Sequence, residues 1–308
     1  MVDFGKTCEA ALPHRKGAHH VTMSHKTAPC GRRLDTGCAV PYDSLRGTTT
    51  EAHLAGDIKP VLDDWPYRPD TVKARVITGR DGNSYVQLRL DLGVIQMRYV
   101  GRPDGERPCG FESYLDYYLD QIEKCRGDTG SDYGLRIKEE HKEAIDREII
   151  QYYHRRTAFF ALKEYGRAAE DAGHSLRTMD LIRKYSDDPT FVSSHERWRP
   201  FVTMERARAM ALESLGDGDH ARALERIEWA REAISRFYSD HGLAQPDGVS
   251  AELGFLNQWA DSIREKYSAP PTLEEQLTVA VEKEEYERAA ELRDQILRLR
   301  MQEGMEPH

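Results

Sequence analysis

Apolar and polar residues alternate along the part of the chain between residues 72 and 99. The alternation occurs in three runs, at residues 72–78, 86–92 and 95–99. A period of two is that of a β-strand with one buried face, and the dipeptide Asp81-Gly82 is a hairpin-turn signal. The pattern therefore predicts a small antiparallel β-meander. We expect its buried face to carry Val86, Leu88, Leu90 and Leu92, and to be covered by Trp65 and Tyr67.

From residue 112 onward, apolar residues recur three or four positions apart, which is the period of an amphipathic α-helix. The first such stripe, which we expect to pack on the meander, is Tyr114, Leu115, Tyr118, Leu119 and Ile122. Two later segments, residues 161–176 and 211–230, share an apolar-glycine step followed by an alanine-rich stretch. This pattern resembles the tetratricopeptide repeat, a resemblance that implies stacked helical hairpins. A plain α-helical bundle is the alternative.

Pro270 and Pro271 break the helical pattern ahead of a last pair of helices. Thr272 and Glu275 form a T-x-x-E capping box at the start of the first helix. The second helix has the 3-4-3 spacing of a short coiled-coil seam at Ala289, Leu292, Ile296 and Leu299, with Tyr286 at the hairpin end. A hairpin of about 28 residues is too small to bury both faces of its helices. We therefore expect it to hang from the proline linker and to leave apolar surface for another domain, another copy or a partner.

These elements predict an α+β protein that is mostly α. The meander is followed by repeat-like helical hairpins and then by the C-terminal hairpin. Residues 1–56 hold seven basic and five acidic residues without a sustained period, so we expect a disordered tail. The remaining boundaries define a meander-plus-helix domain at 57–127, a helical domain at 128–267, and a linker with the terminal hairpin at 268–308.

Charge and cysteine content narrow the classes of partner. The net charge of −9 argues against a broad nucleic-acid face, because phosphate binding needs clustered lysine and arginine. No apolar run approaches the ~18 residues that span a membrane. The five cysteines include no C-x-x-C pair, which favours a reducing, cytoplasmic setting. The histidines and cysteines of the first 56 residues fit no zinc-ligand spacing, so no metal is expected.

The sequence shows no motif of an enzyme. Walker A, H-E-x-x-H, G-x-S-x-G and kinase signatures are all missing, so we expect no catalytic residue and no cofactor. Arg98, Arg102 and Arg107 surround the turn at residues 101–105 and form a candidate anion patch. An enzyme with an unrecognised site in the meander domain is the alternative that this pattern leaves open.

The stretch LEEQLTVAVEKEEYERAAELRDQI, residues 273–296, resembles the UVR domain, also called the UvrB/UvrC motif. The resemblance lies in Tyr-Glu followed by Ala-Ala, then Leu-Arg-Asp and an apolar residue. It implies a helical hairpin that binds proteins, as it joins UvrB to UvrC in nucleotide excision repair and occurs in McsA and in Clp regulators. The partner-binding residues implied here are Tyr286, Glu287, Ala289, Ala290, Leu292, Arg293, Asp294, Ile296 and Leu299.

The rest of the chain differs from those proteins, because it has neither the Walker A motif of UvrB nor the C-x-x-C pairs of McsA. The block at residues 88–105 is similar to one in uncharacterised bacterial proteins that end in a UVR motif. We therefore expect a non-enzymatic bacterial adaptor that docks through its hairpin, in stress response or protein quality control. The alternatives are an accessory factor of excision repair and a homodimer formed by two hairpins.

Overall fold

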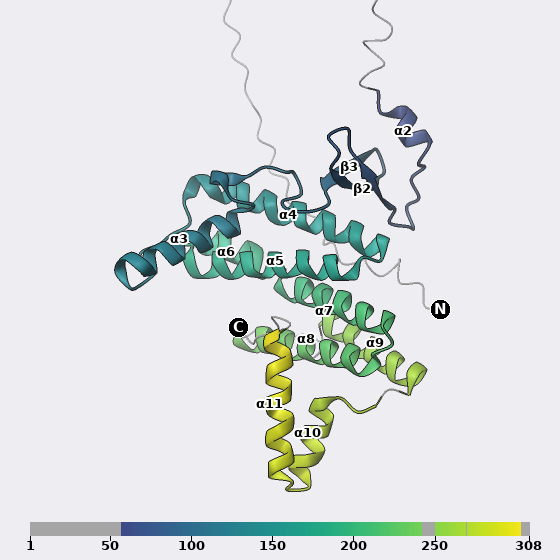
Figure 1. Cartoon of the computed structure of the whole chain (residues 1–308), viewed down its shortest axis with the longest axis vertical. Coiled ribbons are helices and arrows are strands. Elements are labelled where there is room, and N and C mark those ends of the chain that lie inside the picture. The colour runs from purple at the N-terminus through teal and green to yellow at the C-terminus, as the bar shows by residue number, and fades with distance from the viewer. Residues whose placement is uncertain (1–56, 242–249, 269, 303–308) are drawn as a thin grey trace, which may run out of the picture. The chain divides into compact units, whose positions relative to one another are not determined.

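The computed structural model describes residues 57–241, 250–268 and 270–302 (Figure 1). The tail predicted for residues 1–56, with its cysteines and histidines, lies outside the described residues. The chain divides into two compact units. The first comprises residues 1–72 with 89–94, and the second comprises residues 73–88 with 95–308.

The described part of the first unit contains helix α2 (Lys59–Asp63) and the turn that follows Arg89. The Arg89 guanidinium donates to the Trp65 carbonyl oxygen at 2.6 Å and lies 5.9 Å from the centre of the Tyr67 ring. Trp65 and Tyr67 were predicted to cover the apolar face of the meander. Both contacts are made to Arg89, and the cover of the apolar face by these two aromatic side chains stays a prediction. Leu92, also predicted to be buried, is 86% exposed.

The predicted meander is confirmed. Strands β1 (Ala74–Thr78), β2 (Ser84–Leu90) and β3 (Gly93–Arg98) form a sheet in the order β1-β2-β3. β1 and β2 pair antiparallel with Val76 opposite Val86, and Gly82 in their turn has a positive φ of 77°. Val86, Leu88 and Met97 are buried together with Ala158, so the sheet packs on the helix that carries Ala158.

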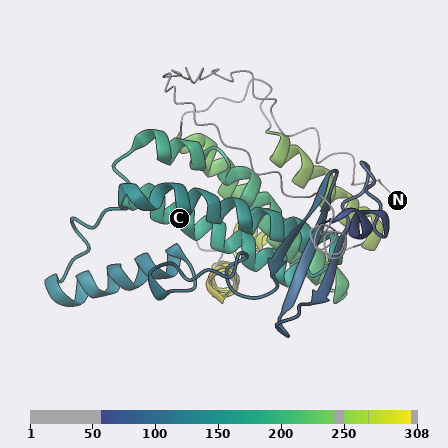
Figure 2. The same cartoon turned by 90° about the horizontal axis from the view of Figure 1, so that it is seen from above.

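Seven α-helices follow the sheet in the described residues before the C-terminal hairpin. They are α3 (Tyr114–Thr129), α4 (Glu139–Leu162), α5 (Tyr165–Tyr185), α6 (Pro189–Glu196), α7 (Arg199–Gly216), α8 (His220–Asp240) and α9 (Ala251–Tyr267). α4 packs on α5, α5 on α7, and α7 on α8. Figures 1 and 2 show α4 and α5 running side by side. The protein is thus α+β and mostly α, as predicted.

Helix α3 packs on other helices rather than on the sheet. Its Leu115, Tyr118 and Ile122 share a core with Ile145 of α4 and Ile182 of α5. The stripe correctly predicted an amphipathic helix but not its packing partner. Residue 127, where a domain boundary was predicted, lies within α3, and the predicted division into domains stays a prediction.

The two alanine-rich segments each cross a corner between helices. Residues 161–176 lead from α4 into α5, and residues 211–230 lead from α7 into α8. Ala168, Ala172 and Ala223 are fully buried at these helix contacts, where a larger side chain would hold the helices apart. The likeness of these hairpins to tetratricopeptide repeats stays a prediction.

A buried ion pair fastens the loop after β3 to the helical core. Arg155 of α4 donates to both carboxylate oxygens of Asp171 in α5, at 2.9 and 2.7 Å. The same guanidinium donates to the carbonyl oxygens of Arg98 at 3.0 Å and Gly101 at 2.5 Å. Bidentate arginine–carboxylate geometry satisfies the charge of both buried groups. Arg155 therefore joins two helices and a loop through one side chain.

Candidate docking hairpin

The C-terminal hairpin consists of α10 (Leu273–Glu282) and α11 (Tyr286–Gln302). The predicted capping box is confirmed: the Thr272 hydroxyl accepts from the Glu275 N–H at 3.2 Å, and the Glu275 carboxylate accepts from the Thr272 N–H at 2.9 Å. Glu284 closes the turn between the helices with a positive φ of 59°. The chain thus satisfies two of the N–H groups at the start of α10 with its own side chains.

A small apolar core holds the two helices together. Ala280 of α10 packs with Ala289 and Leu292 of α11, and Leu273 and Leu277 cover the same cluster. Leu292 is 1% exposed. Ala289 and Leu292, which the resemblance implied as partner-binding residues, therefore lie inside the hairpin.

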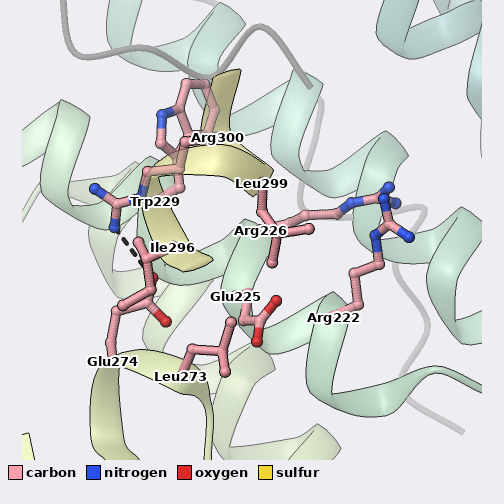
Figure 3. Close-up of a pocket in the computed structure, with 9 residues that line it drawn as sticks. All are labelled: Arg222, Glu225, Arg226, Trp229, Leu273, Glu274, Ile296, Leu299 and Arg300. Carbon is pink, nitrogen blue, oxygen red and sulfur yellow. Dashed lines mark hydrogen bonds and ion pairs between the residues drawn. The ribbon is translucent and has the colours of Figure 1, made fainter. Parts of the chain in front are cut away.

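The end of α11 lies against α8. Figure 3 shows Ile296 and Leu299 of α11 around the same small cavity as Trp229 of α8. The cavity holds about 20 Å³, room for about one water molecule. Its lining residues are Arg222, Glu225, Arg226, Trp229, Leu273, Glu274, Ile296, Leu299 and Arg300. Two more implied contact residues, Ile296 and Leu299, are thus half-buried against the protein's own helix.

Charged side chains from α8, α10 and α11 meet at this joint. Arg300 lies 3.0 Å from Glu232 of α8 and 3.1 Å from Glu274 of α10. Burial raises the pKa of the Glu274 carboxyl above its ordinary value of 4.5, and Arg300 acts in the opposite direction. Arg264 of α9 donates to Glu275 at 2.8 Å. The hairpin was predicted to hang from the proline linker, but contacts with α8 and α9 hold its base.

The outer face of α11 carries an exposed apolar stripe. Tyr286 is 67% exposed, Leu297 is 54% exposed and Met301 is 56% exposed, and Ala290 is exposed between them. Spacings of four, seven and four residues place these side chains along one side of a helix. We define Tyr286, Ala290, Leu297 and Met301 as the outer stripe. Leu297 and Met301 were missed by the sequence analysis, although their spacing from Tyr286 and Ala290 was a readable signal.

The charged residues of the motif also face outward. Glu287, Arg293 and Asp294 are exposed, and Arg293 donates to Asp294 at 2.9 Å. A partner that covers the outer stripe would meet these charges beside it. Of the nine implied partner-binding residues, five are therefore exposed on α11, namely Tyr286, Glu287, Ala290, Arg293 and Asp294.

The predicted anion patch does not form as one exposed surface. Arg102 is only 4% exposed and lies 3.1 Å from Asp104 and 3.6 Å from Glu148. Arg107 pairs with Glu112 at 2.7 Å, and these two arginines line a cavity that Arg98 does not reach. Carboxylates already neutralise Arg102 and Arg107, which the sequence spacing of the three arginines could not show.

In residues 57–241, 250–268 and 270–302, no group of three or more histidine, cysteine, aspartate or glutamate side chains is placed to hold a metal ion. No helix there is both long and apolar enough to cross a membrane.

Comparison with known families agrees with the hairpin geometry. Residues 271–302 match the UVR family model, described as the UvrB/uvrC motif. The match begins just before Thr272 and ends with α11, so it covers the hairpin and nothing else. No curated protein and no solved structure matches the chain. The C-terminal hairpin is therefore a UVR motif, a protein-interaction module found in UvrB and UvrC.

Proposed function

We propose that this protein is a non-enzymatic adaptor of the bacterial cytoplasm that docks a partner protein on the outer stripe of its UVR hairpin. The exposure of Tyr286, Leu297 and Met301 on a motif that binds proteins carries the proposal. Burying a Leu or Met side chain contributes roughly 1.5–3 kcal/mol, so this stripe can supply a large part of a docking free energy. Stress response or protein quality control is the setting we propose.

The division of apolar residues on α11 supports the outer stripe over the seam. Ala289 and Leu292 hold the hairpin together, and Ile296 and Leu299 face α8. A partner on the seam would have to open the hairpin or displace it from α8. A partner on the outer stripe needs neither change, while Arg293 and Asp294 beside the stripe fix its register by charge.

A pull-down from bacterial lysate tests the proposal with Leu297→Asp in the intact chain. The substitution places a charge in the outer stripe without touching the hairpin core, so the partner should be lost while circular dichroism stays unchanged. Gln295→Asp is the matched control, because Gln295 is exposed on the same helix away from the stripe. If both variants retain the same proteins as the parent chain, docking does not use the outer stripe.

A second candidate, an accessory factor of nucleotide excision repair, is favoured by the matched motif itself. The identity of the proteins lost with Leu297→Asp separates the two candidates. Loss of UvrB- or UvrC-type proteins would support repair, and loss of Clp or arginine-kinase components would support quality control. A parent chain that is dimeric by light scattering, with a monomeric Leu297→Asp variant, would instead identify the partner as a second copy.

A further inference from the structure

The C-terminal hairpin has an apolar core of its own. Ala280, Ala289 and Leu292 pack together within α10 and α11, and the two helices lie closely against each other. In the described residues, neither helix packs along the length of α8 or α9. The contacts with those helices lie at the base of the hairpin, where α10 begins and α11 ends. The hairpin can therefore stay folded whether its base lies on α8 or has moved away from it.

One guanidinium bridges the base of the hairpin and α8. We define the contact of Ile296, Leu299 and Arg300 with α8 as the hairpin joint. Arg300 lies 3.0 Å from Glu232 of α8 and 3.1 Å from Glu274 of α10 (Figure 3). Removal of one partner from a largely buried ion pair leaves the remaining charge without compensation. Without Arg300, two carboxylates would face each other across the joint, and their repulsion would favour its opening.

The closed joint is neither fully packed nor fully hydrogen-bonded. A cavity of about 20 Å³ remains where Ile296 and Leu299 meet Trp229. The buried Oε2 atom of Glu274 has no hydrogen-bond donor within the described residues. Missing contacts and an unpaired buried polar atom both cost free energy. These costs oppose the apolar and ionic contacts that close the joint, so a modest change at the joint can open it.

Opening of the joint would change the apolar surface that α11 presents. In the closed state, Ile296 and Leu299 are half-buried beside Trp229, which is 5% exposed. The outer stripe is exposed in the same state, with Leu297 at 54%. Release of the hairpin from α8 would add Ile296 and Leu299 to the exposed surface of the same helix. The closed joint therefore covers one of the two apolar stripes of α11.

We propose that the hairpin joint is an autoinhibitory contact. The hairpin moves as a rigid unit about the linker between α9 and α10, and Arg300 holds it in the closed position, where Ile296 and Leu299 are covered. A protein that binds these two residues binds the open state alone, so its apparent affinity falls in proportion to the open fraction. A protein on the outer stripe binds both states. The proposal does not rest on docking at the outer stripe, which the Leu297→Asp pull-down tests separately.

Protection of an introduced thiol measures whether the joint is closed. Leu299→Cys and Leu297→Cys place a thiol on opposite sides of α11 in the intact chain, with the five native cysteines replaced by serine. We expect N-ethylmaleimide to modify the Leu299→Cys chain at least about fivefold more slowly than the Leu297→Cys chain, because opening must precede the reaction. Equal rates would show that the joint is open in solution and would overturn the proposal.

Arg300→Gln tests the role of the guanidinium in the same assay. The substitution removes the bridging charge and should raise the rate of the Leu299→Cys chain to within about twofold of the Leu297→Cys chain. Arg298→Gln is the matched control, because Arg298 is exposed on the same helix and donates within α11 to the Asp294 carbonyl oxygen at 3.2 Å. It should leave the protection within about twofold of its parent value. Unchanged protection in Arg300→Gln, or an equal loss in both variants, would refute the role of Arg300.

Distances between paired spin labels distinguish release of the hairpin from its unfolding. Labels on Ser235→Cys of α8 and Gln295→Cys of α11 span the joint, and labels on Thr278→Cys of α10 and Gln295→Cys lie within the hairpin. All three positions are exposed. In the background without native cysteines, Arg300→Gln should add a longer distance to the first pair and leave the second unchanged. A change in both pairs would mean that the hairpin unfolds, and a change in neither would mean that the joint stays closed; either result contradicts the proposal.

Discussion

Replacement of Leu292 by alanine is the most direct test of the hairpin core. Leu292 is 1% exposed, and only Ala280 and Ala289 are buried with it. Leu→Ala changes in a core cost about 2–5 kcal/mol, and the cost is lower where neighbours can collapse into the space. Because this core is small and its surroundings are partly open, we expect about 2–3 kcal/mol.

The loss should be local, so hydrogen exchange is the suitable assay. Exchange of protected amides in α11 reports the free energy of opening the hairpin. A loss of about 2–3 kcal/mol corresponds to about 30- to 150-fold faster exchange, since about 1.4 kcal/mol is a factor of ten. Amides of α4 and α5, which share no core with Leu292, should keep their exchange rates.

Leu297→Ala is the control for this experiment. It removes the same atoms from the same helix, but Leu297 is 54% exposed, so the change should stay within about 0.5 kcal/mol. If the two variants accelerate exchange equally, the assignment of Leu292 to the core and Leu297 to the surface is wrong. If α4 and α5 accelerate as much as α11, the hairpin does not open as a separate unit.

Two further predictions concern the fold and the hairpin joint. Arg155→Ala leaves Asp171 buried without its partner and should lower the free energy of unfolding, measured in urea, by about 3–5 kcal/mol. Arg136 belongs to an exposed ion pair, so Arg136→Ala should change the same free energy by less than about 1 kcal/mol. Equal losses in the two variants would contradict the importance of the buried pair. Burial raises the pKa of Glu274, so the folded hairpin binds the proton of this carboxyl more tightly than the unfolded chain does. The protonated carboxyl therefore stabilises the folded hairpin. This stabilisation is complete below the ordinary pKa of 4.5 and is lost as the pH rises through the pKa of the folded state. Glu274→Gln should abolish that pH dependence of α11 protection, measured by exchange corrected for intrinsic rates, and an unchanged dependence would assign it to another group.

Local patterns in the sequence were sufficient to predict those elements that are determined by neighbouring residues in the chain. The meander follows from strand alternation and the Asp81-Gly82 turn, and the start of α10 follows from Thr272 and Glu275. The packing of α3 could not be predicted, because a stripe shows which side of a helix is apolar but not which surface covers it. The sequence therefore predicted an amphipathic α3 and the wrong neighbour.

The same limit explains the hairpin. Helix α11 has two adjacent apolar stripes, and sequence spacing favoured the seam with Ile296 over the one with Leu297. Only the position of α8 shows that Ile296 is covered and Leu297 is not. Arg102 is a similar case, because Glu148, which helps to neutralise it, is distant in sequence and comes close only in the folded chain.

Trp229 forms part of the wall of two cavities, the one under the hairpin base and a larger one between α5, α7 and α8. A rotation of this indole that widens one cavity therefore changes the shape of the other. Coupling of that kind is reciprocal: if a ligand in the larger cavity weakened the contact of α11 with α8 by some factor, release of α11 would weaken binding of that ligand by the same factor. A partner on the outer stripe leaves α11 on α8, so its binding would stand outside this coupling.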